Sequence, residues 1–299
     1  MTLVVVGSVA LDTVETCMGR RERILGGAAS FTSVAATHFT PVQLVGVVGD
    51  DFPELHVATL ARRGVDLLGL ARAPGRTFHW SGRYAPDFSS RESLATELGV
   101  FSGFSPDLPP AYRAAQTLFL ANIHPELQTR VCLQMDHPRL SGCDTMDFWI
   151  RGEPKALAET LKHVHLLTIN DEEVRLLSGE HNVVKAARAV LRMGPRLLVV
   201  KRGEHGAWLF SDDETFAIAA LPLADVVDPT GAGDTFAGGM LGFLDSVPAL
   251  DAGAFRLAMA YGTATASYAV SDFSLDGLLA ATRADLDGRV EALRRLTAF

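Results

Sequence analysis

The sequence has few cysteines and no long apolar run. Its three cysteines, Cys17, Cys132 and Cys143, form no CxxC pair and no metal-ligand spacing. An odd number of thiols cannot all pair as disulfides, so we expect reduced thiols in a cytoplasmic protein. The longest uncharged apolar stretch, Leu257 to Ser271, has 15 residues. A membrane-spanning helix needs about 18 residues, so we expect no membrane partner.

Positive charge is also scarce. Lysine and arginine number 27 against 35 aspartates and glutamates, for a net charge of −8. Such a surface repels phosphate backbones and anionic lipids, which argues against nucleic acid and membrane as partners. The sequence contains no GxxxxGK[ST] loop, and no GxGxxG follows its first apolar run. A P-loop enzyme is therefore excluded, and a dinucleotide oxidoreductase is disfavoured.

Alternating strand and helix patterns are what the sequence does contain. Short β-branched runs predict strands at residues 3–6, 42–48, 117–121, 139–143, 164–169 and 196–200. Helical periodicity predicts helices at 28–38, 52–63, 124–134, 154–162, 171–178, 183–193, 233–246, 251–270 and 284–297. This alternation predicts one α/β domain over residues 1–299, with a mostly parallel sheet covered by helices on both faces.

One segment breaks the alternation. Residues 77–84 have period two, which places Phe78, Trp80, Gly82 and Tyr84 on one face of a strand. A second strand is expected from about Leu94 to Phe101. We expect residues 72–104 to form a small β-rich lid inserted in the domain, acting as a cover or as a homodimer contact. An edge hairpin that covers the core with its aromatic side chains is the alternative.

Polar side chains follow the predicted strands, at the edge where open parallel sheets bind ligands. In chain order these residues are Asp12, Asp51, Asn122, Asp144, Asn170 and Lys201. Aspartate and asparagine side chains beside a basic pair, Lys201 and Arg202, suit a polyhydroxyl substrate next to a metal-chelated phosphate.

The most informative segment is Asp-Pro-Thr-Gly-Ala-Gly-Asp at residues 228–234, directly before a predicted helix. Gly231 and Gly233 permit a sharp turn, and their amides, with that of Ala232, would point at an anion beyond the helix N-terminus. Asp234 is placed to accept a proton from an attacking hydroxyl. A helix N-cap would explain one aspartate, but not the ordered frame of the whole segment.

Residues 228–234 resemble the C-terminal signature of the ribokinase/PfkB family of sugar and nucleoside kinases. The resemblance covers essentially the whole chain and implies a three-layer ribokinase-like fold, with a mostly parallel central sheet and a small antiparallel lid. It also implies an ATP-dependent kinase that uses Mg²⁺. In this family the last aspartate, here Asp234, is the base, and the amides of Gly231, Ala232 and Gly233 form the anion hole.

The resemblance implies a substrate side of the site. Gly26 and Gly27 match the signature that lets substrate approach the backbone, and Asp12 matches the acid that holds substrate hydroxyls. Phe31 stands where many members have a sugar-binding asparagine, and Asn122 is a further expected contact. The acceptor is expected to be a sugar or sugar derivative, with a nucleoside as the alternative. A catalytically silent sugar- or nucleotide-binding protein on the same fold is the remaining reading.

The resemblance also implies a nucleotide side. Asn170 and Glu173 match the family's Asn-x-x-Glu motif, with Glu173 acting indirectly on Mg²⁺. The expected nucleotide contacts also include Lys201, Gly203 and Ala264. Asp228 and Thr230 occupy positions that bind a monovalent cation such as K⁺ in some members.

Overall fold

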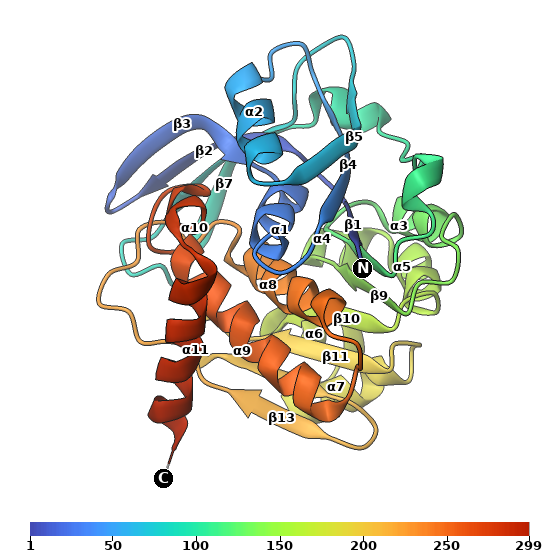
Figure 1. Cartoon of the computed structure of the whole chain (residues 1–299), viewed down its shortest axis with the longest axis vertical. Helices are drawn as coiled ribbons and strands as arrows, with labels where there is room; N and C mark the ends of the chain where they lie inside the picture. Colours follow the sequence, from blue (N-terminus) through green and yellow to red (C-terminus); the bar gives the residue numbers. More distant parts are fainter. Residues whose placement is uncertain (299) are drawn as a thin grey trace.

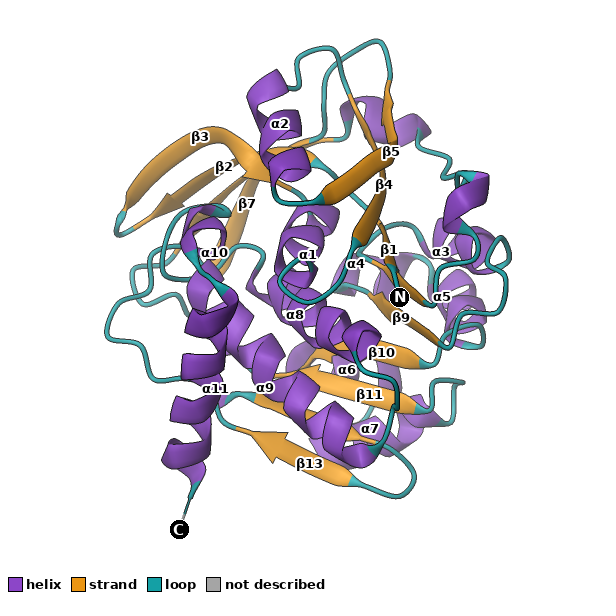
Figure 2. Cartoon of the chain, in the orientation of Figure 1, coloured by secondary structure: helices purple, strands orange, loops and turns teal. Residues whose placement is uncertain are grey.

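The chain folds into two sheets and their covering helices, which the computed structural model describes for residues 1–298 (Figure 2). The strands are β1 (Leu3–Val6), β2 (Ala10–Thr16), β3 (Gly19–Gly26), β4 (Val42–Val48), β5 (Val65–Arg72), β6 (His79–Tyr84), β7 (Arg91–Glu97), β8 (Thr117–Leu120), β9 (Leu140–Asp144), β10 (Leu166–Asn170), β11 (Leu197–Lys201), β12 (Ala207–Phe210) and β13 (Thr215–Ile218). The helices are α1 (Ala28–Ala36), α2 (Glu54–Arg62), α3 (Pro125–Cys132), α4 (Asp147–Gly152), α5 (Pro154–Leu161), α6 (Asp171–Ser178), α7 (Val183–Leu191), α8 (Ala232–Ser246), α9 (Ala252–Ala269), α10 (Asp276–Ala280) and α11 (Arg283–Thr297).

The larger sheet has nine strands in the order β13-β12-β11-β10-β9-β8-β1-β4-β5. All neighbours from β11 to β5 pair in parallel, whereas β12 and β13 add an antiparallel edge. β1 shows how its two faces are buried: Leu3 and Val5 belong to one hydrophobic cluster, and Val4 and Val6 to the other. The predicted mostly parallel, three-layer α/β fold is confirmed.

Helices cover both faces of this sheet (Figure 1). α1, α8, α9 and α11 contribute to one cluster, and α3, α5, α6 and α7 to the other. α8 lies directly against α1, and two glycines of α8 permit that approach. A Cβ on Gly238 would collide with the Thr32 carbonyl, and one on Gly242 would lie 2.8 Å from the Ala36 Cα. This close packing fixes the N-terminus of α8 next to α1. Within the described residues, no helix is both long and apolar enough to cross a membrane.

The second sheet has four strands in the order β3-β2-β6-β7. β2 and β6 pair in parallel, and the other two pairs are antiparallel. The predicted strand at 77–84 is β6, but the strand predicted at 94–101 is displaced: β7 ends at Glu97, and residues 99–103 form a 3₁₀ turn. The small sheet also takes in residues 10–26, which the sequence patterns did not predict as strands.

Candidate active site

Asp234 lies in the first turn of α8, beyond the left-handed Gly231 with φ of 73°. A Cβ on Gly231 would collide with the Phe31 ring, so both backbone and space require glycine here. The Ala232 amide donates to the Pro229 carbonyl at 3.3 Å, whereas within residues 1–298 the Gly231 and Gly233 amides have no hydrogen-bond partner. Two backbone donors at the N-terminus of α8 are therefore available to an anion beside Asp234.

The Asp234 carboxyl is well suited to accept a proton near neutral pH. Its pKa is raised to about 7, chiefly by burial and next by the nearby Asp144 carboxylate. Lys201 and Arg91 oppose that rise through their positive charge. A general base is most effective when its pKa lies near the working pH. Asp234 remains partly exposed to solvent.

Asp12 lies on β2 and faces the same space. It is 5% exposed, and its carboxylate packs so tightly on the Gly26 Cα that any side chain at 26 would collide with it. The pKa of Asp12 is raised to about 7: burial is the main cause, a hydrogen bond from the Gly27 backbone opposes it, and the charges of Asp228 and Asp234 add to it. The structure thus brings together Asp12, Gly26, Gly27 and Asp234, as the sequence predicted.

An aromatic side chain lies beside Asp12. Trp80 of β6 is the register partner of Asp12 in the parallel β2–β6 pair, so both side chains are on the same face of the small sheet. The Arg91 guanidinium lies 5.2 Å from the Trp80 ring centroid. Two other aromatic residues named above are occupied within the protein: Phe31 is buried against Gly231, and Phe78 stacks on Phe101 with centroids 5.5 Å apart. Trp80 is the aromatic residue beside Asp12.

The sequence reasoning missed two residues of this face. The Tyr84 hydroxyl lies 3.0 Å from the Thr230 hydroxyl, which joins the small sheet to the loop before α8. Arg91, the first residue of β7, pairs with Tyr84 across the strands and acts electrostatically on both Asp12 and Asp234. Tyr84 falls on the predicted aromatic face, whereas no pattern in the sequence indicated Arg91.

On the other side of Asp234, charged side chains gather at the ends of β9, β10 and β11. Asn170 caps α6 in a capping box with Glu173. The pKa of Glu173 is raised to about 7, chiefly by burial and next by the Asp144 carboxylate. The Lys201 ammonium donates to Asp144 Oδ2 at 2.6 Å. Gly203 opens a 3₁₀ turn just beyond β11.

Two residues that were expected to contact a ligand are instead engaged within the protein. Asn122 accepts from Trp149 Nε1 at 2.9 Å, and its amide nitrogen lies 3.0 Å from Met146 Sδ. Ala264 is fully buried within α9. Their roles as ligand contacts stay predictions.

Asp228 connects two loops. Its Oδ1 accepts from the Thr230 amide at 2.9 Å, and its Oδ2 accepts from the Ser274 amide at 3.3 Å. Ser274 donates in turn to the Leu25 carbonyl, so the loop before α8, the loop after α9 and the end of β3 are held together. The role of Asp228 and Thr230 as cation ligands stays a prediction, since both oxygens of Asp228 already accept backbone amides.

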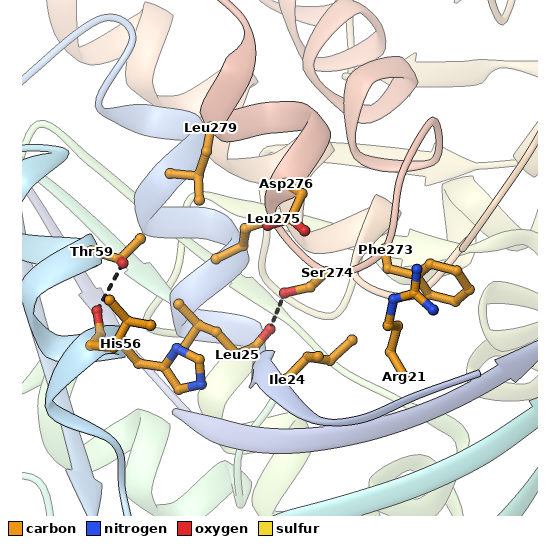
Figure 3. A pocket seen from close by; sticks show the side chains of 11 residues that line it. Arg21, Ile24, Leu25, His56, Thr59, Phe273, Ser274, Leu275, Asp276 and Leu279 are labelled. Atoms are coloured by element: carbon orange, nitrogen blue, oxygen red, sulfur yellow. Dashed lines mark hydrogen bonds between the residues drawn. The ribbon is translucent and has the colours of Figure 1, made fainter. Parts of the chain in front are cut away.

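A cavity of about 220 Å³ lies behind this brace, walled by β3, α2 and the segment that begins at Phe273. Figure 3 shows Ser274 bonded to Leu25 on its wall, with Arg21 beside the Phe273 ring. Neither Asp12 nor Asp234 lines this cavity, so it is separate from the site between those carboxylates.

Comparison with known proteins identifies the family of the chain. Residues 2–278 match the model of the pfkB family carbohydrate kinases. The chain belongs to this family. As a pfkB-family member it is a kinase, an ATP-dependent phosphotransferase.

Three similar proteins of this family carry informative names. A cytidine kinase of Thermococcus kodakarensis is 32% identical over 81% of this chain and 87% of its own length. A fructokinase of Klebsiella pneumoniae is 27% identical over 79% of this chain and 82% of its own. A putative ribokinase II of E. coli, solved with ATP and Mg²⁺, has a TM-score of 0.82 at 20% identity, covering 97% of this chain and 99% of that one. The last likeness shows the shared fold.

Proposed function

We propose that this kinase transfers the γ-phosphoryl group of ATP to a hydroxyl of a nucleoside, with Asp234 as the base. The observation that carries the reaction is the position of Asp234 beside the unpartnered amides of Gly231 and Gly233. The nucleoside assignment is supported by Trp80, whose ring is next to Asp12 and offers a stacking face beside a hydroxyl-binding carboxylate. The cytidine kinase relative supports the same class.

The chemistry is an in-line displacement. The acceptor hydroxyl gives its proton to the Asp234 carboxylate while its oxygen bonds to the γ-phosphorus. The bond between that phosphorus and the bridging oxygen breaks, and ADP keeps the electron pair. The Gly231 and Gly233 amides stabilise the negative charge on the transferred group. Asp12 orients the acceptor by accepting hydrogen bonds from its hydroxyls.

The nucleotide side rests on Asn170, Glu173, Lys201, Gly203 and Ala264. Mg²⁺ would neutralise phosphate charge, and proteins usually hold it through phosphates, waters and one or two carboxylates. Glu173 fits that demand: one carboxylate oxygen accepts the Asn170 amide at 3.0 Å, and the other accepts no hydrogen bond within residues 1–298. Asp228 and Thr230 are proposed to hold a monovalent cation. Because the reaction consumes ATP, we place the enzyme in the cytoplasm.

The small sheet is proposed to act as the lid. Its Asp12, Trp80 and Tyr84 face the Asp234 side, and Tyr84 already touches Thr230. Closure of such a sheet would exclude water from the transferred group. We also propose that the chain forms a homodimer through this sheet. Light scattering tests this, because a monomeric mass would contradict it.

A sugar is the second candidate acceptor, favoured by the fructokinase relative and by the hydroxyl-binding carboxylate of Asp12. Phe31 would then contact the acceptor only after moving away from Gly231, since its ring is buried there.

The test is coupled ADP release across a panel of nucleosides and sugars. We expect a pyrimidine nucleoside to stimulate release, and Asp234→Asn to lower kcat by several orders of magnitude. Asp213→Asn is the matched control, because Asp213 is an exposed residue between β12 and β13. Stimulation by sugars alone would replace the nucleoside assignment. No stimulation by any acceptor, with Asp234→Asn equal to wild type, would favour the silent binding protein.

A further inference from the structure

An ion pair bridges two strands that are not neighbours. Asp144 ends β9 and Lys201 ends β11, with β10 between them. Their side chains meet across the end of β10 at 2.6 Å, with 6% and 17% of their side-chain surface exposed. Burying such a pair costs desolvation, so hydrophobic residues of similar size would serve folding as well or better. Stability alone therefore does not account for this pair at the ligand-binding edge of the sheet.

The ammonium of this pair lies against the first turn of α8. A Cβ on Gly233 would lie 3.0 Å from Lys201 Nζ, closer than ordinary packing, and 3.6 Å from its Cδ and Cε. The absence of a side chain at 233 thus makes room for Lys201. From the sequence, Gly233 was expected to permit a turn and to point its amide at an anion; in the structure it also makes room for a lysine of the same chain.

The ammonium also has capacity left for a ligand. Lysine has three N–H donors, and within residues 1–298 one is used, by Asp144. Three carboxylates, Asp144, Glu173 and Asp234, act on Lys201 electrostatically. The Lys201 ammonium therefore has free donors beside both Asp234 and the Gly233 amide, which has no hydrogen-bond partner within residues 1–298.

We propose that Lys201 is a catalytic residue that contacts the transferred phosphoryl group, and that Asp144 is the positioning residue that holds it there and tunes the base. The inference rests on the proposed function for the direction in which ATP enters. Lysine binds phosphate as a compact point charge on a flexible side chain. The ion pair with Asp144 restricts that side chain and fixes the direction of the ammonium group. Lys201 thereby supplies the charge that the two backbone amides alone do not.

The experiment compares Lys201→Met, Lys201→Arg and Asp144→Asn with the control Lys162→Met, an exposed lysine paired with Glu159. We expect Lys201→Met to lower kcat by about 100-fold, comparable to the loss of one strong transition-state donor. Lys201→Arg, which keeps the charge, should recover part of that loss. Lys162→Met should equal wild type. A kcat of Lys201→Met within threefold of wild type would overturn the proposal.

The pH profile separates positioning from a structural role. The charged groups that act on Asp234 are Asp144 from β9, Lys201 from β11, Arg91 from β7 and Asp12 from β2. Removing the Asp144 charge should move the acid limb of kcat/KM to lower pH, and removing the Lys201 charge should move it to higher pH. A merely structural defect would lower the rate without opposite displacements, and equal or absent displacements would overturn the role of Asp144.

Nucleotide binding keeps the proposal testable without an acceptor. In calorimetry with Mg²⁺, Lys201→Met should weaken the binding of AMP-PNP, a non-hydrolysable ATP analogue, by about 10-fold. The binding of ADP should weaken much less, because Lys201 contacts the terminal phosphate that ADP lacks. Equal weakening of both would overturn the proposal even if a variant were inactive through misfolding of the acceptor side. A further outcome is that wild type turns over no acceptor while Lys201→Met still weakens AMP-PNP more than ADP. In that case the proposed function fails, but the contact of Lys201 with the terminal phosphate stands.

Discussion

The Tyr84 hydroxyl of the small sheet lies 3.0 Å from the Thr230 hydroxyl of the loop before α8. This half-buried contact joins the sheet that carries Asp12 to the loop that carries the anion-binding amides. The small sheet is thus linked to the loop before α8 by a hydrogen bond at the site itself.

Replacement of Tyr84 by phenylalanine removes that link and little else. A neutral hydrogen bond contributes about 0.5–1.5 kcal/mol, so Tyr84→Phe should lower kcat/KM by roughly 2- to 10-fold through a less populated closed state. Steady-state kinetics with the identified acceptor measure this. Tyr261→Phe is the control, because the Tyr261 hydroxyl bonds to Asp287 rather than to the site. An unchanged kcat/KM in Tyr84→Phe would show that the contact does not assist closure.

The site carboxylates should destabilise the fold at alkaline pH. The folded-state pKa values of Asp12 and Asp234 are raised to about 7 from 3.8, chiefly by burial. A carboxyl with a raised pKa binds its proton more tightly when folded, so stability increases as pH falls from about 7 toward 3.8. Asp234→Asn should therefore raise the melting temperature at pH 8 by roughly 2–4 °C, equivalent to about 1 kcal/mol. The gain should vanish near pH 4, and a gain independent of pH would contradict this account.

His38 should act in the opposite direction. Its pKa is lowered from 6.5 to about 4, chiefly by burial and next by the charge of Arg63, whose Nη2 lies 2.9 Å from His38 Nδ1. The unfolded chain then binds a proton that the folded chain does not, so stability falls as pH drops from 6.5 to about 4. Urea unfolding of His38→Gln across this window should show a flatter pH dependence than wild type. His181→Gln, at an exposed residue, is the control.

Asp228→Asn should weaken the brace between the two loops. An asparagine amide can accept from only one of the two backbone amides, so one N–H, of Thr230 or Ser274, faces another donor. Leaving a buried donor unsatisfied costs about 1–3 kcal/mol. We expect a lower melting temperature and a kcat/KM reduced about 10-fold or more, because Thr230 precedes Gly231 directly. Ser274→Ala keeps its backbone amide and should retain most activity; equal loss in both variants would assign the effect to the Leu25 contact.

The central fold was predictable because its strands are buried on both faces. β1, β4 and β8 to β11 are short continuous apolar runs, and each was predicted within two residues of its ends. β5 was missed because it is half-exposed and lacks a clean period, and the edge strands β12 and β13 were missed as well. β3 was missed because its sequence, GRRERILG, is too charged to resemble a strand. Its partner β2 supplies the pairing that overrides composition.

The site was predictable where its residues are contiguous. Residues 228–234 carry their chemistry in their order, and Asp234 is where that order placed it. Contacts between distant strands were not readable in the same way. Tyr84 meets Thr230 across 146 positions, and Lys201 meets Asp144 across 57, so no local pattern indicates either partner. For the same reason the sequence did not indicate that Lys201 lies against Gly233.

The small sheet begins directly after β1, and a single residue, Gly27, separates its second strand in chain order, β3, from α1. Asp12 therefore belongs to one body, the small sheet, and Asp234 to another, the larger sheet with its helices. Gly27, with φ of 89°, lies at the junction between them. Any rotation of one body against the other changes the separation of Asp12 from Asp234, the carboxylates proposed to orient and to deprotonate the acceptor. Opening of the small sheet would therefore separate the two carboxylates at the same time as it releases the product. The open enzyme would then have no assembled site that could transfer phosphate to water.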